Sequence, residues 1–447
     1  MRTAVLLFTR DLRLHDNPAL ASACATAERV VPLFVLDPHL LKLSPNRSRF
    51  LHQALADLRE SLRARGGDLV IRHGDPVAET IAVARAVEAE GVAMTADVSG
   101  YATRRETRLR EACEQHRIGL RAFPGLTVIE PGAVQPGGGR TGGGHYRVFS
   151  PFHRAWAAAQ WRDEVATPQR VPLPPGIDPG ELPEPPAGEA PDAATGGETE
   201  ALRRVKSWLR HIGPYDELHN DLPADGTSRL SPYLRFGCVS PLSLARAVRG
   251  MDGDGPAAYL RQLAWRDFYY QVANGFPALA TQPIRATGDG GWRHDTDALQ
   301  HWQDGLTGVP VVDAGMRQLR DEGWMHNRAR LITAAFMTKH LNLDWRDGVR
   351  WFSRRLLDGD LANNSGNWQW VAGTGNDTRP YRRFNPIRQA LRFDPDGTYV
   401  RRYVPELKGV AGADVHQPWR LPPALRRTLD YPAPLESHRD EAVWLRP

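Results

Sequence analysis

Short apolar runs alternate with longer amphipathic stretches over the first part of the chain. Apolar runs of about four to eight residues are typical of buried strands, and apolar positions that recur every third or fourth residue are typical of helices. This pattern predicts strands at Ala4–Thr9, Val30–Leu36, Leu69–His73, Val92–Ala96 and Leu120–Phe123, and helices at about Pro18–Thr26, Arg49–Arg65, Val77–Glu90 and Thr103–His116. Strands that alternate with helices form parallel sheets through right-handed crossovers, so we expect a doubly wound, five-stranded α/β domain. No GxGxxG follows the first strand, so the pattern does not favour dinucleotide binding there.

Strand patterns stop after residue 200, and helical periodicity takes over. The predicted helices are Ala201–His211, Pro241–Arg249, Ala257–Asn274, Val311–Glu322 and Arg328–His340. Before them, a glycine run at 136–144 and nine prolines within 166–191 cannot propagate a helix or strand, although Tyr146–Phe152 with Trp156 is expected to dock on a domain. The chain is therefore predicted to be α/β plus all-α, with an α/β domain at 1–130, a long linker at 131–200 and a helical domain at 201–447.

Composition narrows the class of protein. A chain of 447 residues exceeds one typical core, and 57 Lys+Arg against 52 Asp+Glu give a net charge of +5, which is compatible with a phosphate-bearing partner. Cys24, Cys113 and Cys238 are far apart, so neither a disulfide framework nor a cysteine-ligated metal centre is expected. The N-terminus runs directly into a predicted strand, and no apolar run is long enough to span a membrane. We therefore expect a cytoplasmic protein without a membrane anchor.

The segment Asp358-Gly-Asp-Leu-Ala-Asn-Asn-Ser-Gly-Asn-Trp-Gln-Trp370 concentrates carboxylates, amides and indoles. Asp and Asn side chains can hydrogen-bond the ribityl chain and ring edge of a flavin, and Trp can pass an electron or stack on a base. The alternative interpretation is a helix N-terminus, in which Asp and Asn cap the helix and the Trp side chains pack inside.

Two other segments combine polar and aromatic groups. Gly226–Ser231 offers hydroxyls, amides and a guanidinium to a phosphate, or else contains a Ser/Thr helix cap. Within Tyr259–Tyr270, Gln262, Trp265 and Arg266 share a helix face that suits a base-binding cavity, or else forms an ordinary amphipathic helix.

Basic residues are the common feature of two further segments. In Gly323–Arg330, Arg330 could pair with an acid of the 358–370 segment, or else lie on a solvated helix face. Residues 376–408 interleave eight Lys/Arg with aromatic residues, as locally opened nucleic acid requires, although such charge runs are more often simply solvated.

These segments occur together in an order that resembles the photolyase/cryptochrome family, most similar to the class I bacterial cyclobutane pyrimidine dimer (CPD) DNA photolyases. The similarity extends from Phe8-Thr-Arg-Asp-Leu-Arg-Leu-His-Asp-Asn17 through Pro405–Leu407. It implies an FAD in the helical domain, an antenna chromophore at the α/β domain, and no metal. It also implies deoxyribodipyrimidine photo-lyase activity, in which an electron passes from excited reduced FAD to a dimer flipped out of damaged DNA. The resemblance further implies a monomer that associates with the bacterial nucleoid when it binds DNA.

The resemblance assigns roles to individual residues. The implied FAD contacts are Tyr215, Thr227, Ser228, Arg229, Leu230, Ser231, Arg330, Asp358, Gly359 and Asp360, with Arg330 as the partner of Asp358. Asn364 would face flavin N5, where an amide oxygen can accept a hydrogen bond. An electron relay from the flavin outward would comprise Trp368, Trp345 and Trp292.

Substrate contacts are implied in the same way. Trp265 and Trp370 would stack on the pyrimidines, while Gln262 and Asn327 would hydrogen-bond them. The remaining DNA contacts would be Arg266, Arg328, Arg382, Arg383 and Gln389. Two positions depart from the family pattern: Gln262 stands where most class I members have Glu, and Leu331 where they commonly have Met. The first departure puts repair efficiency in doubt more than substrate type.

The antenna prediction depends on Asp97 and the following Gly100-Tyr101, with Arg10, Phe34 and Arg47 as neighbours. This pattern resembles members that bind 8-hydroxy-5-deazaflavin, which we favour over methenyltetrahydrofolate.

Two other functions remain alternatives. A cryptochrome-type blue-light photoreceptor with weak or no repair activity is favoured by Gln262, but disfavoured by Asn364, by the basic segment and by the expected lack of a disordered tail. A nucleotide-binding α/β enzyme with a helical appendix would be colourless.

Overall fold

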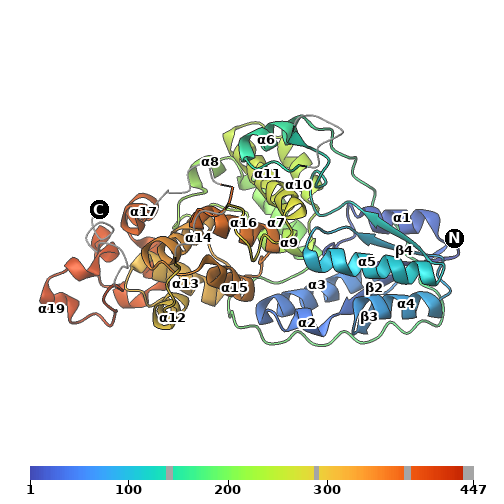
Figure 1. Ribbon diagram of the computed structural model, residues 1–447, viewed down its shortest axis with the longest axis horizontal. Coiled ribbons are helices and arrows are strands. Elements are labelled where there is room, and N and C mark those ends of the chain that lie inside the picture. The colour runs from blue at the N-terminus through green and yellow to red at the C-terminus, as the bar shows by residue number, and fades with distance from the viewer. Residues whose placement is uncertain (137–143, 286–290, 377–383, 436–447) are drawn as a thin grey trace. The chain divides into compact units, whose positions relative to one another are not determined.

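The computed structural model describes residues 1–136, 144–285, 291–376 and 384–435 (Figure 1). The chain forms two compact units. The first comprises Met1–Gly188, Ala194–Gly213 and Ser228–Pro277, and the second comprises Glu189–Ala193, Pro214–Thr227 and Ala278–Pro447. The predicted helical domain begins at residue 201, but residues 194–213 and 228–277 cluster with the sheet in the first unit. The domain limits 1–130, 131–200 and 201–447 stay a prediction.

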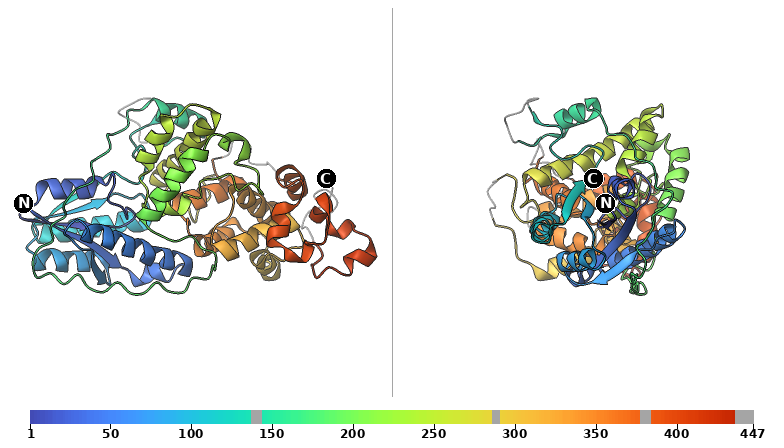
Figure 2. Two further views of the ribbon diagram at one scale, coloured as in Figure 1. Left: turned by 180° about the vertical axis from the view of Figure 1, so that it is seen from behind. Right: turned by 90° about the vertical axis from the view of Figure 1, so that its right-hand side faces the viewer.

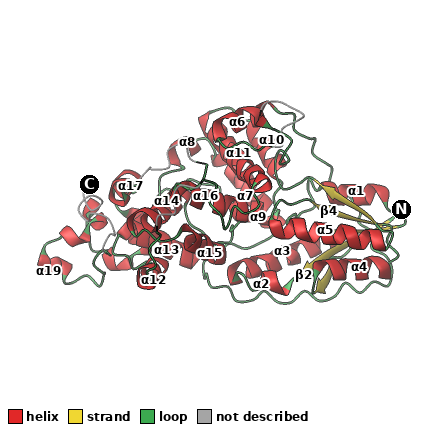
Figure 3. Cartoon of the chain, in the orientation of Figure 1, coloured by secondary structure: helices red, strands yellow, loops and turns green. Residues whose placement is uncertain are grey.

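A five-stranded parallel sheet organises the first unit, as the sequence predicts. Its strands are β1 (Thr3–Leu7), β2 (Arg29–Leu36), β3 (Val70–His73), β4 (Gly91–Thr95) and β5 (Gly119–Phe123). The order is β3-β2-β1-β4-β5, so β1 is central and Val5 aligns with Val31 on one side and Val92 on the other. Helices flank the strands (Figure 3), which explains why the inner strands read as continuous apolar runs.

The first unit also contains helices, some with a side-chain N-cap and some without one. They are α1 (Pro18–Thr26), α2 (Pro38–Leu41), α3 (Pro45–Arg63), α4 (Pro76–Ala86), α5 (Gly100–Gln115), α6 (Phe149–Ala158), α7 (Glu198–His211), α9 (Ser231–Phe236), α10 (Pro241–Arg249) and α11 (Asp254–Gly275). Asn17, Asp75 and Ser99 each accept a hydrogen bond from the first turn of the helix that follows. The predicted helices are confirmed. The sequence did not predict α2, which is too short to show a helical periodicity.

Asp267 of α11 binds the part of the chain that follows the last strand, including α6. One of its oxygens, Oδ2, accepts hydrogen bonds from the backbone N–H groups of Val128 and Ile129 at 2.9 and 3.0 Å, and from Trp156 Nε1 at 2.9 Å. The predicted docking of residues 146–156 is thereby confirmed. Burial raises the pKa of Asp267 to about 6, although Arg266 and these hydrogen bonds oppose the rise.

This raised pKa predicts a pH-dependent stability difference between the wild type and Asp267→Asn. The folded chain holds the proton of Asp267 more tightly than the unfolded chain, so this contribution to folding is complete below about pH 4 and is lost as the pH rises through about 6. From pH 4 to pH 7, the unfolding free energy of the wild type should fall by roughly 2–3 kcal/mol relative to that of the variant. Urea denaturation at several pH values measures it. Asp163→Asn, at a fully exposed side chain, should show a constant difference, and a constant difference for Asp267→Asn would contradict the assignment.

The second unit is helical (Figure 2). Its elements are α8 (Tyr215–Leu218), α12 (Thr296–Asp304), α13 (Pro310–Glu322), α14 (Asn327–Ala335), the π-helix η2 (Phe336–His340), α15 (Trp345–Arg355), α16 (Leu361–Ala372), α17 (Pro386–Phe393), α18 (Thr398–Tyr403), η3 (Pro405–Leu407), η4 (Gly412–His416), η5 (Pro418–Arg420) and α19 (Pro423–Arg426). The helix predicted at Arg328–His340 is therefore α14 followed by a π turn. Within the described part of the chain after residue 200, extended pairing is limited to one bridge between Arg293 and Leu343. None of the helices in the described residues is long and apolar enough to cross a bilayer.

Candidate functional site

The structure realises the helix N-terminus interpretation of the 358–370 segment at the start of α16, and flavin binding there stays a prediction. Asp360 caps the helix by accepting a hydrogen bond from the Asn363 N–H at 2.9 Å. Asp358 forms a two-pronged ion pair with Arg330, with Nη1···Oδ1 at 3.1 Å and Nη2···Oδ2 at 2.8 Å, and Arg330 Nε also donates to the Met325 carbonyl. The predicted Arg330–Asp358 pair is thus confirmed. It joins α14 to the entry of α16, and Gly359 lies in the turn between Asp358 and the cap.

Asn364 lies on the face of α16 that it shares with Asp360 and Trp368, because these residues are four positions apart. Its Nδ2 donates to the Val349 carbonyl at 3.1 Å and to Ser353 Oγ at 2.9 Å, both on α15. These two bonds fix the amide so that Oδ1 points away from its α15 partners. No described residue donates to Oδ1, so this oxygen can accept a hydrogen bond from a ligand.

The three tryptophans of the predicted relay are held by neighbouring elements. The Trp368 ring lies against Gly348, where an added Cβ would come within 2.1 Å of the indole. Trp345 is one helical turn before Gly348 on α15 and is fully buried. Trp292 is next to Arg293, whose N–H donates to the Asn342 carbonyl at 2.8 Å. Asn342 is three residues before Trp345, so this bond links the chain around Trp292 to the start of α15. The fold therefore brings the three positions into one cluster of the second unit. Their order from the flavin outward and electron transfer through them stay predictions.

Residues 227–231 turn the chain into α9. Arg229 has a left-handed φ of +50°, and Leu230 is in the right-handed helical region. The Leu230 N–H donates to Ser228 Oγ at 3.3 Å, so the turn is closed by a side chain of the same segment. The helix-cap alternative is not realised, since α9 has no side-chain cap hydrogen bond. Besides the Leu230 N–H, Ser228 Oγ accepts from the Tyr259 hydroxyl at 2.9 Å.

Two further predicted FAD residues are described in the second unit. Tyr215 is buried at the start of α8. Thr227 Oγ1 is buried without a hydrogen-bond partner in the described part of the chain. A buried orphan hydroxyl costs stability unless a ligand satisfies it. In the second unit, the Thr227 hydroxyl and the Asn364 oxygen therefore offer hydrogen-bonding groups of the kind that FAD requires.

The predicted base-binding residues of the first unit lie on α11. Gln262 is exposed and Trp265 is half-buried. Phe149 of α6 stacks on Trp265 with ring centroids 3.7 Å apart and planes 5° apart, and Arg261 lies over the Phe149 ring at 4.9 Å. This stack fixes the plane of the indole.

Arg266 occupies a different environment from its helix neighbours. Its Nη1 donates to the Leu126 carbonyl at 2.5 Å, its Nη2 reaches the Leu234 carbonyl at 3.3 Å, and its guanidinium lies over the Tyr270 ring. These internal bonds favour a structural role over the predicted DNA contact.

The second unit carries the other predicted DNA residues. Asn327 is exposed at the start of α14, and Trp370 is half-buried beside Phe384, with centroids 6.2 Å apart. Arg328 Nη1 lies 3.4 Å from Gln389 Oε1. Arg382 and Arg383 lie outside the described residues.

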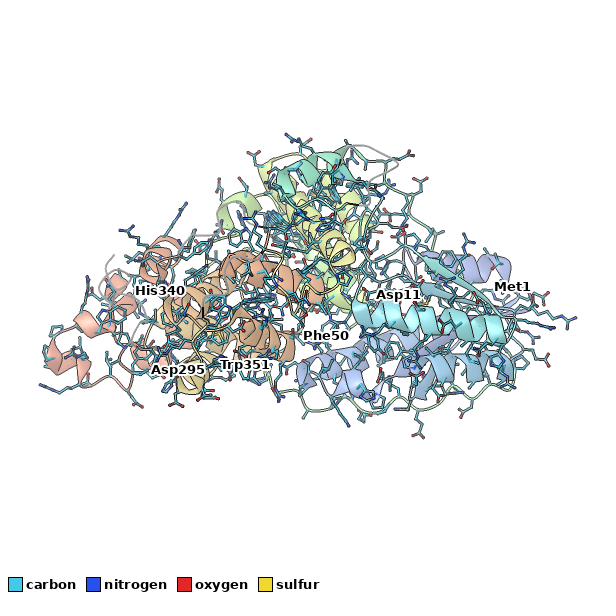
Figure 4. The ribbon with its side chains drawn as sticks, in the orientation of Figure 1. Met1, Asp11, Phe50, Asp295, His340 and Trp351 are labelled. Carbon is cyan, nitrogen blue, oxygen red and sulfur yellow. The ribbon has the colours of Figure 1, made fainter. Side chains whose placement is uncertain are left out.

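Two of the predicted antenna residues, Arg10 and Asp97, follow the carboxyl ends of β1 and β4. Figure 4 labels Asp11, the residue after Arg10, well away from Met1 near the start of β1. Arg10 Nη1 contacts Asp97 Oδ2 at 3.2 Å, so these two residues pair with each other. On α5, the Tyr101 hydroxyl donates to Asp37 at 2.5 Å. The Nε and Nη2 of Arg105 are buried without hydrogen-bond partners among the described residues, and burial lowers the pKa of Arg105.

Comparison with known proteins identifies the family. Residues 4–174 match the family model described as DNA photolyase, and residues 259–444 match the model described as the FAD binding domain of DNA photolyase. The chain belongs to the photolyase/cryptochrome family. The second match supports FAD as the cofactor of this photolyase-family chain.

Individual members of the family are similar along nearly the whole chain. The deoxyribodipyrimidine photo-lyase of Streptomyces griseus is 47% identical over 442 residues, covering 97% of this chain and 96% of the relative. The structure of a bacterial class III photolyase from Agrobacterium tumefaciens has a TM-score of 0.92 and 33% identity, covering 98% of this chain and 95% of that one. An archaeal photolyase from Sulfolobus tokodaii, described with two FAD molecules and a novel light-harvesting cofactor, has a TM-score of 0.83 and 26% identity, covering 99% and 98%.

The sequence did not identify several residues that shape these photolyase-family sites. They are Phe149, which stacks on Trp265; Ser353, which orients Asn364; Gly348, which receives the Trp368 ring; and Arg105, at the edge of the sheet. The aromatic content of residues 146–156 was the signal that could have indicated Phe149. The other three have no local pattern, because their partners are distant in sequence.

Proposed function

We infer that this chain is a deoxyribodipyrimidine photo-lyase that repairs cyclobutane pyrimidine dimers in DNA under blue light. The observation that carries this inference is the similarity to the Streptomyces griseus deoxyribodipyrimidine photo-lyase along nearly the whole of both chains. When bound, reduced FAD supplies the light-excited electron that opens the two cyclobutane bonds, and it recovers that electron afterwards.

We propose that residues of the second unit orient the flavin. Asn364 accepts the hydrogen bond of flavin N5–H through Oδ1, because its Nδ2 is already held by Val349 and Ser353. The ion pair between Arg330 and Asp358 fixes the start of α16, and with it the position of Asn364. The side chains thus provide geometry and electrostatics, and the cofactor provides the redox chemistry.

We propose that residues of both units contribute to binding damaged DNA. Arg328 and its neighbours attract phosphates, and each neutralised phosphate releases counterions. In the first unit, Phe149 covers one face of Trp265, so the opposite face of the indole is the one that remains for a pyrimidine. A dimer pairs and stacks poorly, so it costs less to flip out of the duplex than a normal step does, and this difference provides discrimination.

Repair is tested with the purified holoprotein, reduced chemically and mixed with UV-irradiated oligothymidylate. Blue light should restore the thymine absorbance, and a sample kept in the dark should not change. Protein that contains FAD but leaves the dimers intact would overturn the repair function and favour the cryptochrome-type photoreceptor. Colourless protein would overturn both functions.

We propose an antenna chromophore with an anionic group at the carboxyl edge of the sheet, with 8-hydroxy-5-deazaflavin favoured over methenyltetrahydrofolate. This edge lies at the switch point between β1 and β4, where open α/β sheets bind ligands. The partnerless nitrogens of Arg105 and the orphan hydroxyl of Thr9 support an anionic ligand there. The Sulfolobus tokodaii structure, with its two FAD molecules, adds a flavin to the candidates.

The antenna is tested by releasing the chromophores and recording their spectra. Arg105→Ala should lose the antenna band and keep FAD, whereas Arg104→Ala, on the exposed side of α5, should keep both. Retention of the antenna by Arg105→Ala would contradict its placement at this edge.

We also propose that the protein is a cytoplasmic monomer that binds no metal and associates with the nucleoid through DNA. Light scattering during size-exclusion chromatography measures the oligomeric state, and a dimer mass at micromolar concentration would contradict the proposal.

A further inference from the structure

The guanidinium of Arg328 is held in the second unit by neutral groups. Its Nη2 and Nε donate to Asn220 Oδ1 at 2.6 and 3.2 Å, and its Nη1 approaches Gln389 Oε1 at 3.4 Å. The Phe393 ring lies beneath it, 4.3 Å from the guanidinium carbon. Among the residues that the structure describes, no carboxylate pairs with Arg328. The side chain is therefore fixed in place while its positive charge is not cancelled.

The amide of Asn220 is itself oriented at both ends. His219 Nδ1 lies 2.8 Å from the Tyr215 carbonyl, and because a carbonyl only accepts, Nδ1 carries the proton. His219 Nε2 is then an acceptor, and Asn220 Nδ2 donates to it at 2.9 Å. This leaves Asn220 Oδ1 directed at Arg328. A chain of hydrogen bonds thus runs from the start of α8 to the guanidinium.

An uncancelled charge in this position is costly without an anion. Burial, and secondarily the nearby Arg392, lower the pKa of Arg328 to about 10, so the guanidinium stays protonated at neutral pH. A carboxylate in place of Asn220 would stabilise the same geometry more strongly, because ion-paired hydrogen bonds are about twice as strong as neutral ones. It would also remove the attraction for a phosphate. The chain uses an amide, which keeps the geometry and leaves the charge available.

We propose that Asn220 is a positioning residue for DNA binding, which holds Arg328 as a preorganised, uncompensated cation for one backbone phosphate. This proposal rests on the proposed function, since it concerns how the same protein holds damaged DNA. Asn220 acts through Arg328, and Gln389 and Phe393 complete the support. The site recognises a phosphate and carries no information about the base sequence.

Asn220→Asp tests the proposal because it changes charge and almost no volume. The holoprotein is titrated in the dark with UV-irradiated and undamaged duplexes over a range of salt concentrations. Loss of one phosphate contact should weaken binding to both duplexes by roughly tenfold at low salt and make the log–log salt slope shallower by about 1. The ratio of the two affinities should stay constant, because a phosphate contact does not distinguish the duplexes. The melting temperature should not fall, because the new ion pair with Arg328 offsets the lost hydrogen bond from Asn220 Nδ2 to His219 Nε2.

Two further variants complete the experiment. Asn274→Asp makes the same change of net charge at an exposed position of α11 and should leave the slope unchanged. Arg328→Ala should lower the slope as Asn220→Asp does, and adding Asn220→Asp to Arg328→Ala should have no further effect, since both remove the same contact. A salt slope for Asn220→Asp equal to that of Asn274→Asp would overturn the positioning role. Failure of the wild type to prefer the irradiated duplex would instead count against the proposed function and leave the Asn220 comparison interpretable.

Discussion

Replacing Trp345 with phenylalanine should slow the light-driven reduction of protein-bound FAD by on the order of 100-fold, equivalent to about 2.7 kcal/mol of activation free energy. Phenylalanine preserves an aromatic ring in the core but is much harder to oxidise than tryptophan. Trp345, Trp368 and the half-buried Trp292 belong to one cluster, and Trp345 is the middle member of the predicted relay, so its loss should interrupt that relay. The rate is measured from the flavin absorbance under continuous blue light with an external reductant.

Trp302 provides a matched control for this prediction. It is also fully buried, and its ring is 6.0 Å from that of Trp368, but its Nε1 donates to the Thr333 carbonyl in the interior. Trp302→Phe should reduce the flavin at nearly the wild-type rate. Equal losses in both variants would show that the loss is not specific to the predicted relay, and no loss in Trp345→Phe would contradict a relay through Trp345. Repair by chemically reduced Trp345→Phe should persist, because that assay does not need the relay.

Local patterns were sufficient to predict the sheet and most helices. The strand around Val5 is buried on both faces and reads as a continuous apolar run, and α10 is preceded by the cap Ser240, so each element is specified by neighbouring residues. The residues alone suggested that Arg330 pairs with an acid of the 358–370 segment, and the family resemblance selected Asp358 as that acid. The pattern of apolar and polar residues does not by itself predict that α14 and α16 are in contact.

Contacts between distant residues account for what the sequence did not indicate. The clustering of residues 228–277 with the sheet depends on bonds such as that of Arg10 Nη2 to the Tyr270 hydroxyl at 2.6 Å, across 260 positions. No local sequence pattern singles out Asn220 or Arg105. Their roles depend on the fold, which brings Asn220 to Arg328 and buries two nitrogens of Arg105 without hydrogen-bond partners in the described part of the chain. Arg266 shows the converse: its position on a predicted DNA-binding face is clear from the sequence, but its internal carbonyl partners are not.

Asp358→Ala should destabilise the protein by roughly 2–4 kcal/mol, because it leaves the Arg330 guanidinium unpaired in a largely buried position. The Asp358 side chain is 5% exposed and that of Arg330 is 25% exposed, so water compensates only part of the loss. Urea denaturation of the FAD-free protein measures the effect on folding alone. Asp347→Ala removes one partner of the exposed pair with Arg350 and should cost less than about 1 kcal/mol.

A double variant separates the structural role of the pair from its predicted role at the flavin. Replacing both partners with apolar residues, as in Asp358→Leu with Arg330→Met, removes the unpaired charge and should recover most of the lost stability. If the pair also positions FAD, this stable double variant should still release FAD more readily than the wild type. Retention of FAD at wild-type affinity would limit the pair to folding. If the stable double variant loses FAD while Asp347→Ala retains it, the carboxylate and guanidinium act at the cofactor. Stability would then depend on avoiding an unpaired buried charge, and FAD binding would depend on the two charged groups themselves.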